Sequence, residues 1–276
     1  MLPLRCLLAA TLAAAACVAP ASASPARVQP SDLHLDHLHP ATLSYLVHWH
    51  GAPGEGIERT MLATTRVARE RVDGADAWVI EQDWEDGSGR VHTARTVHAA
   101  DDMRTLAQTS TWNRPTGRYT STVIPGSGQG RIEGQLPQEA RRQMEAGFAA
   151  MRDGWWMNWH SDLTLLPLLP YEKGGTLRIR LFDVGMAAPA DVDYTVLGER
   201  TLQGADGTRY DCWLVQTQGT HPGDDNYQRF WIDKARRLVV KEEDVYEGRY
   251  RSKVLLAVPA TTEFQAGRAP AAATPR

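Results

Sequence analysis

The stretch that decides the fold covers residues 136–170 and reads LPQEARRQMEAGFAAMRDGWWMNWHSDLTLLPLLP. Pro137 suits the first position of a helix, because the N–H that proline lacks would be unpaired there, and Glu139 adds negative charge to the first turn. Gly154 suits a helix end, because glycine adopts the left-handed conformation cheaply. Between them, apolar side chains form one stripe of a helix at about 137–153. They are Ala140, Met144, Gly147, Phe148 and Met151.

The rest of the chain has the pattern of short strands separated by turns. Residues 42–134 and 176–258 each contain several runs in which apolar and polar side chains alternate. About a dozen such strands, with a turn roughly every ten residues, are typical of sandwiches and barrels. We therefore expect a mainly β (α+β) protein with a single domain over 42–258. Its curved antiparallel sheet or half-barrel wraps around the one main helix, either as one sheet or as two packed halves.

The first residues have the pattern of a secretion signal. Arg5 precedes an apolar run, and Ala21-Ser22-Ala23 fits the small-residue rule for cleavage. This predicts a signal peptide over 1–23 and a periplasmic or secreted protein. Cys17 leaves a second interpretation open, because a lipoprotein signal would lipidate such a cysteine. That signal usually has leucine three positions earlier, where this chain has Ala14.

Charge and cysteine content narrow the function classes. The formal net charge is −3 over 276 residues, and no long run of like charges occurs, so no nucleic-acid partner is indicated. Once the signal is removed only Cys212 remains, so the mature chain cannot form an internal disulfide. Residues 24–41 are interpreted as a polar lead-in, and 259–276 as a disordered tail.

The C-terminal half carries a series of short motifs on its predicted strands. They lie at Tyr194–Glu199, Asp206–Thr208, Cys212–Val215, Phe230–Asp233 and Val239–Glu242. Over about residues 176–257 this series resembles an exported bacterial domain-of-unknown-function family. That family is similar in fold to periplasmic lipoprotein carriers, whose curved sheet wraps helices and encloses an apolar cavity. The resemblance implies this fold, and it implies a lipid or a lipoprotein as a possible partner.

Histidines cluster near the start of the mature chain, and imidazole is the commonest protein ligand for zinc and copper. Five of the nine histidines are His34, His37, His39, His48 and His50. Their order does not match the metallo-β-lactamase pattern. His37, His39, His48 and His50 are candidate metal ligands; the alternative is that they face solvent on a lead-in and an edge strand.

Other catalytic motifs are missing from the sequence. Residues 125–129 lack the first glycine of a nucleophile elbow, and no glycine-rich loop leads into the Lys-Ser/Thr of a phosphate site. The acidic run Glu242-Glu243-Asp244 alternates between the faces of a predicted strand and is expected to be solvated surface. We therefore predict no catalytic residue and no cofactor.

Aromatic and methionine side chains are dense around the predicted helix. Rigid tryptophan faces and adaptable methionines could form the wall of an apolar pocket between helix and sheet, or they could be the packed core. The candidate ligand-binding residues are Met144, Phe148, Met151, Trp155, Trp156 and Trp159.

Three hypotheses follow from the sequence. The first is a non-enzymatic envelope protein that holds a hydrophobic ligand or a lipidated partner in an apolar cavity. The second is an envelope scaffold with a packed core that binds a partner by strand addition. The third is a metal-binding hydrolase that uses the N-terminal histidines.

Overall fold

The computed structural model describes residues 25–51, 55–151, 154–204, 207–218, 226–246 and 248–257. Within them every strand belongs to one sheet. The predicted signal peptide, Cys17 and the predicted tail lie outside these ranges.

The strands of the N-terminal half run from the lead-in to the predicted helix, and those of the C-terminal half follow that helix. The first group is β1 (Ala26–Arg27), β2 (Ala41–His50), β3 (Ile57–Val72), β4 (Ala75–Asp86), β5 (Gly89–Ala99), β6 (Thr105–Arg114), β7 (Gly117–Ile124) and β8 (Gln129–Gly134). The second is β9 (Met157–Asn158), β10 (Thr176–Phe182), β11 (Ala190–Gln203), β12 (Arg209–Gln218), β13 (Tyr227–Asp233), β14 (Leu238–Tyr246) and β15 (Arg249–Ala257).

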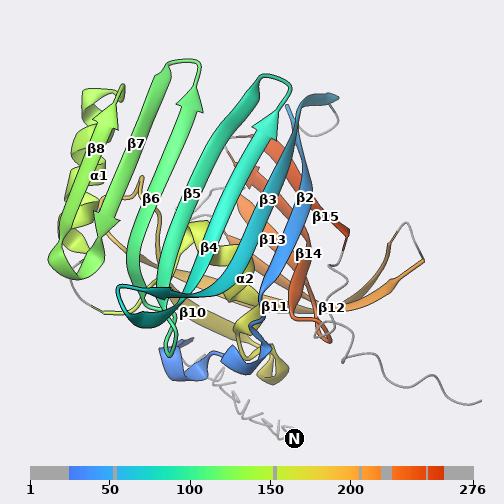
Figure 1. The fold of residues 1–276 in the computed structure, drawn as a ribbon. Coiled ribbons are helices and arrows are strands. Elements are labelled where there is room, and N and C mark those ends of the chain that lie inside the picture. The colour runs from blue at the N-terminus through green and yellow to red at the C-terminus, as the bar shows by residue number, and fades with distance from the viewer. Residues whose placement is uncertain are drawn as a thin grey trace, which may run out of the picture.

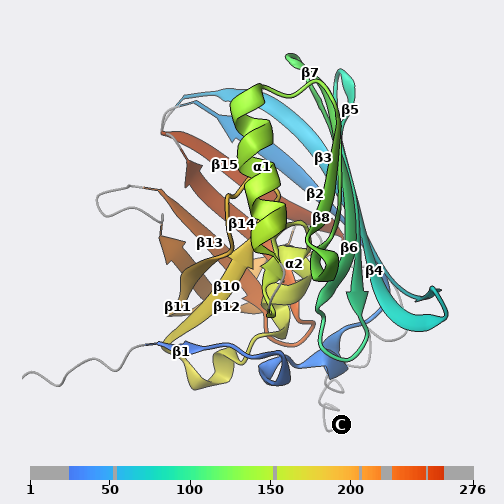
Figure 2. The same ribbon diagram turned by 90° about the vertical axis from the view of Figure 1, so that its left-hand side faces the viewer.

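The sheet is continuous and strongly curved. Its strand order is β1-β10-β11-β12-β13-β14-β15-β2-β3-β4-β5-β6-β7-β8, with the short β9 paired to β10. Antiparallel pairing of β15 with β2 joins the two halves into one sheet. The two halves form facing walls with the helices between them (Figure 1, Figure 2). The predicted fold class, a curved mainly β sheet with few helices, is confirmed.

Local sequence explains the tight turns of this sheet. Between β3 and β4, Asp73 and Gly74 have φ values of 50° and 83°. Two successive positive φ values make the turn type that matches the twist of a two-residue hairpin, and Asp-Gly is a preferred pair for it. This turn sets the register in which Val72 pairs with Ala75.

The helices cover the concave face at two places. The predicted main helix is α1, which covers Gln138–Ala150 and ends earlier than predicted, because the Met151 N–H bonds back to Phe148 O in a tighter final turn. α1 lies at the open side of the curved sheet (Figure 2). A chain of short turns lies deeper between the walls: η4 (Trp159–Ser161), α2 (Asp162–Leu165) and η5 (Leu166–Leu168). The segment 157–168, called the inner segment below, occupies the centre that the sequence assigned to the main helix.

The largest apolar cluster fills the space around the inner segment and includes Leu163, Leu165 and Leu166. The lead-in adds Val28 and Leu33 to this cluster, so it is more than a polar tether. Four short 3-10 helices complete the described elements: η1 (Pro30–Asp32) and η2 (Leu35–His37) in the lead-in, η3 (Pro125–Ser127) between β7 and β8, and η6 (Tyr171–Lys173). Among the described residues, no helix has the length and apolar character needed to cross a membrane.

Candidate functional site

The inner segment is bound to strands β4–β6 by buried hydrogen bonds. The backbone N–H of His160 donates to Asn158 Oδ1 at 2.9 Å, so the Asn158 amide nitrogen must be a donor toward Gln108. That nitrogen donates to Gln108 Oε1 at 2.5 Å, and Gln108 Nε2 in turn donates to His160 Nδ1 at 2.9 Å. These three bonds form a closed ring of hydrogen bonds. The backbone N–H of His160 fixes the orientation of both amides in it, because each side-chain amide has one donor end and one acceptor end. Neutral His160 therefore carries its proton on Nε2.

A second imidazole holds the next residue of the same segment. His98 Nδ1 lies 2.9 Å from Met103 O and must carry the proton, because a carbonyl oxygen only accepts. Its Nε2 then accepts a hydrogen bond from Ser161 Oγ at 2.8 Å. Burial lowers the pKa of His98 to about 4, against the raising effect of the bond to Met103, and burial also lowers the pKa of His160 well below its usual value. Both imidazoles are consequently neutral near pH 7.

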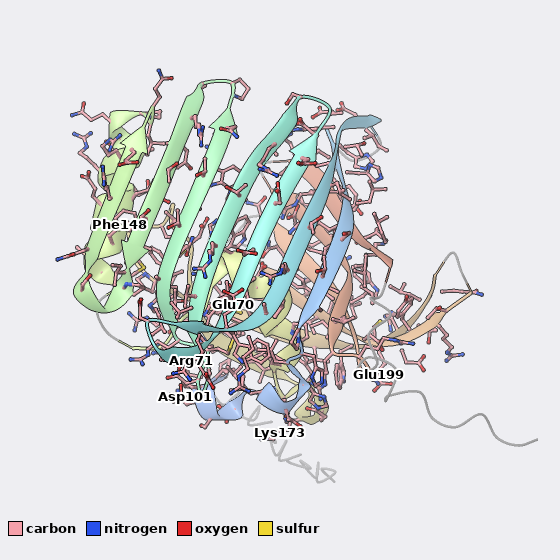
Figure 3. The ribbon with its side chains drawn as sticks, in the orientation of Figure 1. Glu70, Arg71, Asp101, Phe148, Lys173 and Glu199 are labelled. Carbon is pink, nitrogen blue, oxygen red and sulfur yellow. The ribbon has the colours of Figure 1, made fainter. Side chains whose placement is uncertain are left out.

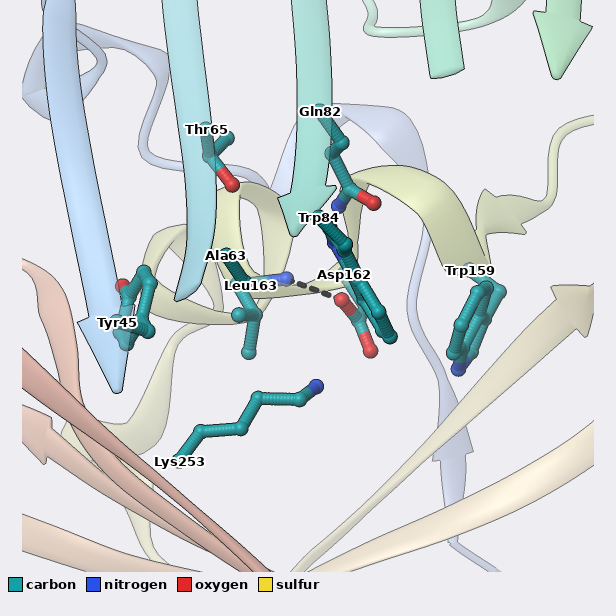
Figure 4. A pocket seen from close by; sticks show the side chains of 9 residues that line it. All are labelled: Tyr45, Ala63, Thr65, Gln82, Trp84, Trp159, Asp162, Leu163 and Lys253. Atoms are coloured by element: carbon teal, nitrogen blue, oxygen red, sulfur yellow. Dashed lines mark hydrogen bonds between the residues drawn. The ribbon is translucent and has the colours of Figure 1, made fainter. Parts of the chain in front are cut away.

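A small cavity lies where the inner segment meets β2–β4 and β15. Its volume is about 10 Å³, the space of a single water molecule. Its walls combine charged, amide, hydroxyl and aromatic side chains, and the tryptophan Trp159 is only half-buried (Figure 4). The lining residues are Tyr45, Ala63, Thr65, Gln82, Trp84, Trp159, Asp162, Leu163 and Lys253.

Beside this cavity, five charged side chains are buried together on the inner segment and on β14 and β15. This ionic cluster consists of Asp162, Glu242, Asp244, Arg251 and Lys253. Glu242 forms an ion pair with Lys253 at 2.6 Å and accepts a hydrogen bond from Arg251 at 3.0 Å, and Arg251 also pairs with Asp244. Removing ions from water is expensive unless they are paired. The sequence-based expectation that Glu242 and Asp244 are solvated surface is wrong, because both point into the concave face.

The carboxyls of the ionic cluster titrate differently. Burial raises the pKa of Asp162 to about 7, opposed by Lys253 and reinforced by Glu242. Burial acts in the same direction on Glu242, but Lys253 and Arg251 outweigh it and lower its pKa. When Asp162 is neutral, two carboxylates face two cations, so the cluster is balanced in charge.

Aromatic rings connect the cavity to the open side of the sheet. Trp84 lies 6.1 Å from Trp159 and 6.1 Å from Trp112, measured between ring centroids. His92 stacks on Trp112 at 3.8 Å, and the Lys253 ammonium lies 5.5 Å from the Trp84 ring centroid. Trp112 packs against both apolar clusters, so the row of rings leads from the cavity toward α1.

The structure divides the six predicted ligand-binding residues between two places. Four of them, Met144, Phe148, Met151 and Trp156, join a second apolar cluster, called the seam cluster below; Trp155 and Trp159 pack against the main cluster instead. The other members of the seam cluster come from β7, β10 and the loop after β10: Tyr119, Val123, Phe182 and Val184. Of the six residues, Trp159 lines a cavity described here.

The seam cluster lies between β7, next to one end of the sheet, and β10, next to the other. In the described part of the chain, β8 pairs with β7 but not with β10. Phe148 lies beside β8 at this edge (Figure 3), where a Cβ on Gly130 would overlap its ring. On the other side of α1, a Cβ on Gly147 would overlap Met186 O, so the helix backbone meets the loop after β10 directly. The two glycines allow α1 to fit between both ends.

The predicted metal ligands are not brought together. His48 bonds to Thr60 and His50 to Glu55 O near the end of β2, whereas His37 and His39 line a cavity of about 20 Å³ before its start. No group of three or more His, Cys, Asp or Glu side chains that could hold a metal occurs in the ranges that the structure describes.

Sequence reasoning missed the buried polar residues, although a signal was present. Glu242 and Asp244 share one strand face, and Arg251 and Lys253 share one face of the next strand. In the structure, Glu242 is paired directly with Lys253 and Asp244 with Arg251. Opposite charges at matching spacings of two on consecutive strands indicate cross-strand pairs.

Comparison with known proteins identifies the family. Residues 44–254 match the model of the family described as "Protein of unknown function (DUF3108)". The chain belongs to this family. The match confirms the predicted domain-of-unknown-function relationship and corrects its extent, since it includes the N-terminal half of the sheet as well as residues 176–254. No protein of curated function matches the chain.

Solved structures support the fold. A β-barrel-like protein of the DUF1849 family from Brucella abortus is similar with a TM-score of 0.51 at 10% identity, over 81% of this chain and 99% of that one. A DUF1329 family protein from Desulfovibrio piger aligns with a TM-score of 0.28 at 11% identity, over 80% and 85% of the two chains. A LolA superfamily protein from Nitrosomonas europaea aligns with a TM-score of 0.20 at 8% identity, over 83% and 91%. The last two likenesses are too weak to support a shared fold.

Proposed function

We propose that this DUF3108 protein is a non-enzymatic binding protein of the bacterial envelope that holds a hydrophobic ligand, such as a lipid acyl chain, beneath α1. The observation that carries the proposal is the seam cluster, in which apolar side chains of one helix bridge β7, next to one end of the curved sheet, and β10, near the other, two strands that do not pair with each other. Such contacts are non-directional, and methionine adapts to different neighbours. Displacement of α1 would therefore uncover an apolar strip between β7 and β10.

Opening is a necessary part of this proposal. The two described cavities have volumes of about 10 and 20 Å³, far below the space of an acyl chain. The polar contacts of α1 favour a movable helix, because they are few and lie near the surface: Arg141 donates to Ile132 O and Gly134 O on β8, and Gln143 donates to Gly185 O. A ligand chain would take the place of Phe148 and Met144 against the sheet.

The test is lipid uptake by the full mature chain. Protein is incubated with vesicles of phosphatidylethanolamine and phosphatidylglycerol, recovered, and weighed by native mass spectrometry. We expect about one lipid per chain, and we expect Gly147→Val, which cannot seat α1 against Met186, to take up lipid roughly tenfold faster. Ala149→Val adds a similar side chain at an exposed position of the same helix and should behave as the wild type.

A packed scaffold protein is the second candidate, and the closed interior favours it. The outer edge of β8 pairs with no strand in the described part of the chain, and most of its side chains are exposed. An edge of this kind can accept a strand from a partner. If the wild type takes up no lipid at any temperature below unfolding, the binding proposal is contradicted and the scaffold proposal remains.

A further inference from the structure

The cavity beside Asp162 contains a hydrogen-bond acceptor with no partner. Gln82 Nε2 donates to His160 O at 2.8 Å, which fixes the orientation of the amide, because two carbonyl oxygens cannot pair. Its Oε1 is buried and has no hydrogen-bond partner among the described residues, and Gln82 is only 6% exposed. An unpaired buried acceptor is unfavourable. A donor group entering the cavity would therefore be stabilised there.

The same cavity has a hydrogen-bond donor with capacity to spare. Lys253 Nζ forms an ion pair with Glu242 Oε2 at 2.6 Å, and an ammonium group has three N–H donors. In Figure 4, Gln82 lies above and Lys253 below Asp162. Asp162 Oδ1 already accepts from the backbone N–H of Leu163 at 2.6 Å. The cavity thus matches a group that donates on one side and accepts on the other.

The size of the cavity selects among groups of that kind. A volume of about 10 Å³ holds one water molecule, and a hydroxyl group is the organic group of the same size and hydrogen-bonding character. A carboxylate or phosphate is larger, and it would add negative charge beside Asp162 and Glu242. The aromatic walls formed by Trp84 and Trp159 suit the carbon atoms next to a hydroxyl.

We propose that this cavity binds a hydroxyl group of the hydrophobic ligand, which donates to Gln82 Oε1 and accepts from Lys253 Nζ. The proposal rests on the proposed function. The hydrocarbon chain would follow the row of rings Trp159, Trp84 and Trp112, and Trp112 contacts the seam cluster. The site thereby gives the ligand a direction, with its polar end at the inner segment and its apolar end beneath α1.

The test compares two small-molecule probes that have the same hydrocarbon chain. 1-Decanol has the hydroxyl, and 1-methoxydecane replaces its proton with a methyl group; binding of each to the full mature chain is measured by calorimetry. We expect the wild type to bind the alcohol at least about tenfold more tightly, which corresponds to one hydrogen bond of ordinary strength. Gln82→Met, which removes the acceptor, should abolish the preference.

Thr96→Val is the matched control. Thr96 is a fully buried polar residue on β5 whose hydroxyl also has no partner within the part of the chain that the structure describes. It does not line the cavity, so this variant should keep the preference. Equal binding of the two probes by the wild type would overturn the hydroxyl site while leaving the seam proposal intact. Absence of binding by either probe would overturn both. The binding of the two probes by the wild type tests the hydroxyl site even if Gln82→Met does not fold.

Discussion

Two segments cover the concave face of the sheet, and different forces hold them there. The inner segment is tied to β6 by a closed ring of buried hydrogen bonds through Asn158, Gln108 and His160, and single buried bonds from Gln82 and His98 tie it to β4 and β5. α1 is held by the apolar contacts of the seam cluster and by a few bonds near the surface. Breaking a buried ring leaves donors and acceptors unpaired, whereas an apolar contact can be remade with another apolar surface. We therefore expect α1 to be displaced more easily than the inner segment.

Low pH is expected to have the largest effect on the contacts that hold the inner segment. Unfolded histidine binds a proton as the pH falls below about 6.5, while burial keeps the pKa of folded His98 at about 4. Between these values the unfolded state binds more protons, so stability falls as the pH falls. A difference of about 2.5 units corresponds to a loss of about 3 kcal/mol from this one residue.

Asp162 changes stability with pH in the opposite direction. The contribution of His98 must therefore be isolated by comparing the wild type with a His98 variant. Its pKa is raised to about 7, so the folded state binds more protons than the unfolded state and gains stability as the pH falls toward about 3.8. The measurement is urea unfolding of wild type and His98→Gln at several pH values from 7 to 4. The stability difference between them should shrink with acid by about 3 kcal/mol. Parallel pH curves would show that His98 takes up its proton without cost to the fold.

A matched pair of glutamines tests the two segments at neutral pH. Gln108→Leu leaves the buried His160 Nδ1 without its partner and leaves the Asn158 amide nitrogen only its longer bond to Thr105 Oγ1, which should lower the free energy of unfolding by about 2 kcal/mol. Gln143→Leu removes an exposed bond from α1 to Gly185 O and should change it by no more than about 0.5 kcal/mol. Urea unfolding of both variants gives the two values. Equal losses would mean that α1 is held as firmly as the inner segment.

Local patterns predicted the elements better than their places. The apolar stripe through Met144, Phe148 and Met151 predicted α1, and alternation in strands such as β10 predicted the sheet. Which segment sits at the centre depends on contacts between residues far apart in the chain, such as Gln108 with His160, and no local period contains them. Polar residues on inward faces were therefore assigned to solvent, as Glu242 was, although its pairing with Lys253 buries it.

Hydrogen exchange of the free wild type, followed by mass spectrometry, tests the central claim most directly. Protection factors are compared between peptides from α1 and peptides from the inner segment, at a pH where His98 and His160 are neutral. The account predicts that α1 opens on its own, with protection at least about tenfold lower than that of the inner segment. Exchange of both segments at one common rate, set by global unfolding, would contradict it, as would an inner segment that opens first.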